Sequence, residues 1–319
     1  MRNRKVTQTL KAIEVTEGAG VSVHRSIGSP ALKNLDPFLL LDHFSSHDPD
    51  DYIAGFPDHP HRGFITLTYM LDGHMLHQDS MGNKGNLVAG GAQWMKAASG
   101  VIHSEMPQQA EGLMSGFQLW INLPAAEKLT SPEYQEYSPR SIPVVESDDS
   151  QVKIICGEYA ASKGLITDPI TELQYFDIRL NANREFSHVL DQRFNGFIYL
   201  FEGAADYSAT HLPEYTMLVL GEGDRVRLKA GNAGCRFILV AGLPIGEPIV
   251  QYGPFVMNTK AEIEQAIASA VYTSYSKEQN ISTEIMLDEL SYTSPLSIVM
   301  AEKVKRLRQW AQSRTVPVD

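Results

Sequence analysis

The chain has 319 residues, of which 43% are hydrophobic and 20% are charged, and its formal net charge is −11. This acidic balance argues against a protein that binds the nucleic-acid backbone directly. The two cysteines provide no disulfide framework, no stretch is long and apolar enough to span a membrane, and no apolar signal region follows the basic start, so we expect a cytoplasmic protein.

The first part of the chain has the patterns of β-strands. Residues 6–27 alternate between apolar and polar side chains around a glycine-rich turn at 18–20. The run 35–44 is short, apolar and begins with an Asp-Pro pair, which is typical of a buried strand. The acidic stretch 47–51 contains one histidine, one proline and three aspartates, and we interpret it as a solvated loop rather than a metal site.

Two pairs of side chains that are able to bind a metal lie at the ends of the stretch 56–105. The first pair is His59 and His61, and the second is His103 and Glu105. Residues i and i+2 of a strand face the same side, so two neighbouring strands would bring three imidazoles and one carboxylate to one point. This donor set suits a divalent transition metal, whereas closed structural zinc sites are usually rich in cysteine.

The segment between the two pairs is expected to support them. The run 64–71 is rich in β-branched and aromatic residues, and Asp72-Gly73 after it is a turn signal. We expect its odd-numbered residues, starting with Ile65, to continue the face that bears the first histidine pair. Strands are broken by glycine turns about every eight to twelve residues up to position 100, which indicates an antiparallel sandwich or barrel.

The second half of the chain repeats the strand pattern after a change in composition. Residues 125–150 contain three prolines and many charges, which is typical of a linker. Apolar runs then return between 152 and 242 and predict a second barrel. It contains His188 and His211, which form no i, i+2 pair, so we interpret both as ordinary histidines, although Glu185 has a spacing that would let it approach His188.

These patterns divide the chain into four parts: a metal-binding barrel at 1–124, a linker at 125–150, a second barrel without metal ligands at 151–258, and a helical segment with a tail at 259–319. Thr259 and Glu262 have the spacing of a capping box and predict that a helix begins there. A basic run at 299–310 is compatible with a further helix.

Several segments occur in an order that is specific to one protein family. They are 25–28, 35–42, the run His59-Pro60-His61-Arg62-Gly63-Phe64 within 56–64, 77–83, 93–95, 100–105, 118–124 and 252–259. Through these segments, about residues 11–268 resemble the pirin family of the cupin superfamily.

The resemblance implies an all-β fold of two double-stranded β-helix (cupin, or jelly-roll) barrels in one chain, with short C-terminal helices. It also implies one metal in the N-terminal barrel, with His59, His61, His103 and Glu105 as ligands. Family members commonly have Glu at the position of Ile65. We expect this difference to leave metal binding intact and to change the surroundings of the site.

The resemblance further implies quercetin 2,3-dioxygenase activity, with iron(II) as the first choice of metal and Ni, Mn, Cu, Co or Zn as alternatives. A flavonol and O₂ would be the substrates, and Glu105 is our candidate for the catalytic base. The alternative is a non-enzymatic regulator that binds a transcription factor or metabolic enzyme according to its metal or redox state. A cupin isomerase or a different small-molecule dioxygenase is a third hypothesis. We expect a monomer in each case.

Overall fold

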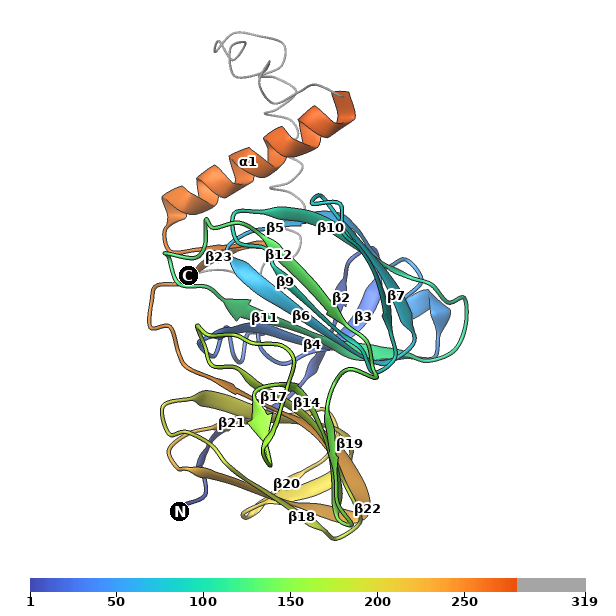
Figure 1. Cartoon of the computed structure of the whole chain (residues 1–319), viewed down its shortest axis with the longest axis vertical. Coiled ribbons are helices and arrows are strands. Elements are labelled where there is room, and N and C mark those ends of the chain that lie inside the picture. The colour runs from blue at the N-terminus through green and yellow to red at the C-terminus, as the bar shows by residue number, and fades with distance from the viewer. Residues whose placement is uncertain (280–319) are drawn as a thin grey trace.

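The structure is a computed structural model that describes residues 1–279 of the chain. The predicted helical run at 299–310 lies outside the described residues. Figure 1 shows two bodies of strands, one above the other, with a single helix beyond the upper body. The prediction of an all-β chain with two barrels is therefore confirmed.

The first barrel consists of two antiparallel sheets. The larger sheet has the strand order β12 (Glu133–Tyr137), β9 (Ala92–Lys96), β6 (Phe64–Asp72), β11 (Met114–Asn122), β4 (Phe38–Ser46), β3 (Val21–Arg25) and β2 (Ile13–Glu17). The smaller sheet has the order β5 (Phe56–His61), β10 (Val101–Pro107), β7 (His74–Asp79) and β8 (Lys84–Val88). A 3₁₀ turn, η1 (Pro49–Asp51), follows β4.

The second barrel is one larger curved sheet. Its strand order is β1 (Val6–Lys11), β21 (Thr216–Leu220), β19 (Asn195–Tyr207), β22 (Arg225–Gly242), β17 (Gln174–Leu180), β14 (Ser150–Cys156) and β13 (Val144–Glu146). Two shorter strands extend it: β18 (Glu185–Val189) pairs with β22, and β20 (Thr210–Leu212) pairs with β19. A small hairpin, β15 (Glu158–Tyr159) and β16 (Ser162–Lys163), follows β14.

Three connections link the two barrels more closely than a simple linker would. The first strand, β1, pairs with β21 of the second barrel. The segment 125–150 contributes β12 to the first barrel and β13 to the second. After the second barrel, the hairpin of β23 (Val250–Tyr252) and β24 (Phe255–Met257) returns to the first barrel, where Phe255 bridges to Arg62. The boundaries at 124, 150 and 258 stay predictions.

The C-terminal helix α1 (Lys260–Gln279) begins where the capping box predicts. The Thr259 backbone N–H donates to Glu262 Oε2 at 2.8 Å, and the Glu262 N–H donates to Thr259 Oγ1 at 3.3 Å. Ile263 and Ala266 on this helix pack against Phe255 and Met257. The helix therefore covers the returning hairpin.

The buried apolar residues show which strand faces pack between the barrels. Ile65, Leu67 and Tyr69 on β6 belong to one cluster with Tyr175 and Phe197 of the second barrel. The Tyr69 hydroxyl also donates to Asp177 Oδ2 across the interface, at 2.6 Å. The odd-numbered face of β6 therefore contacts the second barrel.

The prediction that Ile65 lies on the ligand face is wrong. The even-numbered face of β6 is the one that faces the site, because Thr68 lines the pocket described below and donates a hydrogen bond to Glu105. Between β5 and β6 the chain turns at Gly63, whose φ is +88°. A turn of this kind ends the alternation of the first strand, so the parity of β5 does not continue into β6.

Candidate metal centre

The two predicted ligand pairs lie on neighbouring antiparallel strands. In the pairing of β5 with β10, His59 is opposite His103 and His61 is opposite Val101. The register shifts after His103, so Glu105 is opposite Phe56. The strand arrangement that the i, i+2 spacing requires is therefore present.

The three histidine rings converge. His59 Nε2 and His61 Nε2 are 3.0 Å apart, and the ring centroid of His103 lies 4.3 Å from that of His59 and 4.8 Å from that of His61. One ring nitrogen from each histidine lies within 4.8 Å of the others. His61 and His103 are buried, whereas His59 is partly exposed at the pocket wall.

The electrostatics of this group favour neutral imidazoles. Burial lowers the pKa of His61 well below its ordinary value, and the neighbouring His59 adds to this effect. Burial likewise lowers the pKa of His103, with His59, His61 and His77 adding to it. Among the described residues His103 Nε2 has no hydrogen-bond partner. Neutral rings with an available lone pair are what a metal ligand needs, so the group fits a divalent transition metal.

Glu105 lies beside the histidines in a buried and hydrogen-bonded position. Its Oε1 accepts from Thr68 Oγ1 at 3.2 Å, and its Oε2 accepts from Gln118 Nε2 at 3.1 Å. Burial raises the pKa of Glu105 to about 7, although both hydrogen bonds act in the opposite direction. One oxygen of Glu105 lies within 4.8 Å of ring nitrogens of His103 and His77.

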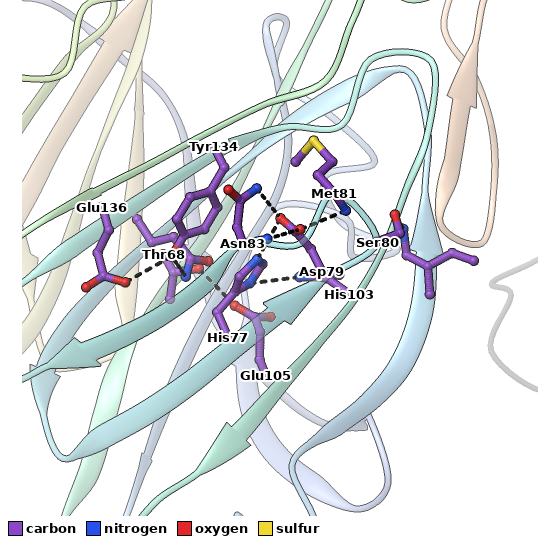
Figure 2. Close-up of polar contacts among 12 residues, drawn as sticks. Thr68, His77, Asp79, Ser80, Met81, Asn83, His103, Glu105, Tyr134 and Glu136 are labelled. Carbon is purple, nitrogen blue, oxygen red and sulfur yellow. Dashed lines mark hydrogen bonds and ion pairs between the residues drawn. The ribbon is translucent and has the colours of Figure 1, made fainter. Parts of the chain in front are cut away.

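His77 is the neighbour that the sequence reasoning missed. It lies on β7 opposite Glu105, and Asp79 on the same strand lies opposite His103. Figure 2 shows His77 between Glu105 and the Asp79 carboxylate, with dashed contacts that continue to Asn83. His77 and Asp79 share the i, i+2 spacing of the ligand pairs, and this spacing was the available signal.

His59, His61 and Glu105 line a pocket of about 600 Å³, whereas His103 is not among its lining residues. The wall also includes Trp120 and Gln118, and an ion pair in which Arg25 binds Asp42 at 2.6 Å. The returning C-terminal hairpin supplies the wall residues Gln251, Gly253 and Pro254. Pockets of this size with apolar walls and a few convergent polar groups are typical of sites for small organic ligands.

The second barrel has no comparable group among residues 1–279. His188 Nε2 lies 3.1 Å from Gln174 Oε1, and burial lowers the pKa of His188 to about 4. Glu185 pairs with Arg227 at 2.5 Å instead of approaching His188. His211 is exposed and pairs with a nearby aspartate.

Among residues 1–279, no helix is long and apolar enough to cross a membrane.

The chain is similar to known proteins along most of its length. The Pirin family model matches residues 20–121, and the model of the Pirin C-terminal cupin domain matches residues 175–270. A protein of Pseudomonas aeruginosa provisionally named quercetin 2,3-dioxygenase is 44% identical over 274 residues, which are 83% of this chain and 96% of the relative.

Solved structures show the same fold. The crystal structure of a quercetin 2,3-dioxygenase from Acinetobacter baumannii matches with a TM-score of 0.79 at 33% identity, over 86% of this chain and 98% of the other. An Escherichia coli pirin, YhhW, solved in complex with nickel(II), matches over 76% of this chain and 97% of its own with a TM-score of 0.57 and 20% identity, a likeness that shows the fold alone. With both domain models matched in order and relatives above 40% identity along most of its length, the chain belongs to the pirin family of two-barrel cupins.

Proposed function

We propose that this protein is a metal-dependent dioxygenase that opens the central ring of a flavonol such as quercetin. The observation that supports this proposal most strongly is the convergence of three histidines, with a buried carboxylate beside them, at the wall of an organic-sized pocket. The names of the relatives from Pseudomonas and Acinetobacter support the same reaction class. The proposed metal ligands are His59, His61, His103 and Glu105.

Three imidazoles and one carboxylate suit an open, six-coordinate divalent transition metal. Four protein ligands in six-coordinate geometry leave two positions for small molecules. We therefore propose iron(II), with Ni, Mn, Cu, Co and Zn as the alternatives to be tested.

The pocket wall and Glu105 have separate proposed roles. Trp120 and other apolar residues form a wall for the flat ring system of the substrate, while a bound metal would act as a Lewis acid toward its 3-hydroxyl and 4-keto oxygens. Glu105 takes the proton of the 3-hydroxyl group, and Thr68 and Gln118 hold its carboxylate in position. The electron-rich flavonolate then reacts with O₂: both oxygen atoms enter the opened product, and one ring carbon leaves as carbon monoxide.

The test begins with metal analysis of protein purified without added metal. Oxygen uptake and carbon monoxide release are then measured with quercetin for the metal-loaded protein. One CO released per O₂ consumed is the expected result. Metal-loaded protein that consumes no O₂ with any flavonol would refute the proposal. If such protein then retained a transcription factor or metabolic enzyme only in its metal-loaded form, the regulator alternative would be favoured.

A further inference from the structure

The pairing of β7 with β10 places a second polar system directly behind the proposed ligands. His77 Nδ1 lies 3.4 Å from His103 Nδ1, and His77 Nε2 lies 3.2 Å from Asp79 Oδ2. The side chains of His77 and Asp79 are 1% and 0% exposed. A buried carboxylate, a buried imidazole and a proposed metal ligand are thus in consecutive contact (Figure 2).

The hydrogen-bond partners of Asp79 fix its role as an acceptor. Asp79 Oδ1 accepts from the backbone N–H groups of Met81 and Asn83 at 2.9 and 3.0 Å, and Oδ2 accepts from Asn83 Nδ2 at 2.8 Å. A carboxylate that receives these donors is ionised, and an ionised carboxylate donates nothing. The proton in the contact with His77 must therefore be on His77 Nε2.

The position of the proton on His103 follows from the position of the proton on His77. A neutral His77 that is protonated at Nε2 presents a lone pair at Nδ1. The contact with His103 is then a hydrogen bond only if His103 Nδ1 carries its proton. An imidazole with its single proton on Nδ1 holds a lone pair at Nε2. That Nε2 is the buried atom for which the described residues provide no hydrogen-bond partner.

Packing keeps the His77 ring in this orientation. Tyr134 on β12 stacks on it with a centroid distance of 4.7 Å and an interplanar angle of 22°. The Tyr134 hydroxyl donates to Glu136 Oε2 at 2.9 Å and accepts from Gln93 Nε2 at 3.3 Å. The stack fixes the plane of the His77 ring, and a flip within that plane would break its contacts with Asp79 and His103. The segment between the barrels therefore helps to determine the orientation of a ring behind the site.

We propose that Asp79 and His77 are positioning residues that hold His103 in the tautomer protonated at Nδ1, so that its Nε2 is always available to a divalent metal. The inference rests on the metal site of the proposed function. Outer partners of this kind typically change metal affinity by about 10- to 100-fold when they are removed, because the ligand otherwise samples the wrong tautomer and orientation.

Two variants test the proposal in different ways. His77→Phe keeps the ring stacked on Tyr134 but removes the acceptor for His103. Asp79→Asn keeps the size of the side chain but presents an amide N–H to His77, which reverses the direction of the hydrogen bonds and moves the proton of His103 to Nε2. His74→Phe on the same strand is the matched control, because His74 contacts the distant Asn86 instead.

The readouts are the dissociation constant for Co(II), by competition with a chelator, and the tautomer of His103 in metal-free protein, by ¹⁵N NMR of the imidazoles. We expect a 10- to 100-fold weaker affinity in both variants and an unchanged one in His74→Phe. Wild-type His103 should be protonated at Nδ1, and Asp79→Asn should shift it to Nε2. Unchanged affinity and tautomer in the two variants would overturn the proposal, as would a second Co(II) ion bound between His77 and His103.

The tautomer measurement separates this inference from the proposed function. If the wild-type protein binds no metal, the dioxygenase proposal fails, but Nδ1 protonation of His103 that depends on Asp79 still supports the positioning role. If the protein binds metal and oxidises flavonols while its metal-free form has His103 protonated at Nε2, the dioxygenase proposal stands and the positioning role is refuted. The NMR experiment also decides the question if His77→Phe does not fold.

Discussion

Replacement of Lys128 with Met should destabilise the protein because three hydrogen-bond acceptors would lose their donor. Lys128 is 1% exposed, and its ammonium group donates to Gly63 O at 2.7 Å, to Asn122 Oδ1 at 2.6 Å and to Val256 O at 3.1 Å. One side chain thus joins the β5–β6 turn, the end of β11 and the returning hairpin. Methionine fills a similar volume but donates nothing.

Two opposing contributions determine how much the free energy of unfolding changes in Lys128→Met. Each buried acceptor left without a donor costs about 1–3 kcal/mol, so three of them cost about 6 kcal/mol. Against this, burial lowers the pKa of Lys128 to about 8 from its ordinary value of 10.5. A lowering of this size corresponds to about 3 kcal/mol of desolvation, which the variant regains. We therefore expect a net loss of about 3 kcal/mol in the free energy of unfolding.

The assay is urea unfolding of the metal-free protein, with Lys96→Met as the control. Lys96 forms ion pairs with Glu127 and Glu133 near the surface, so its replacement should change the unfolding free energy by less than about 1 kcal/mol. In Lys128→Met the affinity for Co(II) should also fall, because the Gly63 carbonyl that is released lies two residues after His61. A Lys128→Met protein that is as stable as the control would refute this reasoning.

Three further predictions concern the site. His61→Ala should remove most of the metal found by elemental analysis, whereas His188→Ala should leave the metal content unchanged; equal losses would contradict the ligand assignment. Glu105→Gln keeps the shape and an oxygen donor but removes the base, so O₂ uptake with quercetin should fall by about 10²-fold or more, while metal content falls much less. Ile65→Glu places a carboxyl group among apolar side chains between the barrels, so thermal unfolding should show a loss of about 2–4 kcal/mol without a gain in oxygen uptake; increased uptake would show that this position does act on the site.

The orientation of each pair could be predicted because the decisive information is local, while the role of these residues as metal ligands stays a prediction. A spacing of two residues fixes the face of each side chain in any strand, so His59 with His61 and His103 with Glu105 had to point together. The spacing alone does not determine that the two strands pair; the family resemblance implied the same four ligands. The fold class followed for the same reason, since strand alternation and turn residues are properties of short segments.

Other parts of the site depend on contacts that no short segment encodes. The face of Ile65 was mispredicted because the positive φ of Gly63 interrupts the alternation between β5 and β6. His77 gains its place behind His103 only through the register of β7 with β10. Lys128 lies in a stretch whose composition is typical of a linker. Its buried ammonium group donates hydrogen bonds to three acceptors that are far apart in the chain. Such relations appear only after the chain has folded.

The partner strands of β1 and the position of the β23–β24 hairpin have a consequence for biosynthesis. Val6–Lys11 are synthesised about 200 residues before Thr216–Leu220, the strand with which they pair. The pocket wall is complete only when Gln251–Pro254 have emerged from the ribosome. Long-range pairings of this kind make folding slow, and they leave strand edges exposed in incomplete chains. The histidines of the first barrel are therefore synthesised before its pocket can be completed. The finished site depends on almost the whole described chain, and not only on the barrel that contains the proposed ligands.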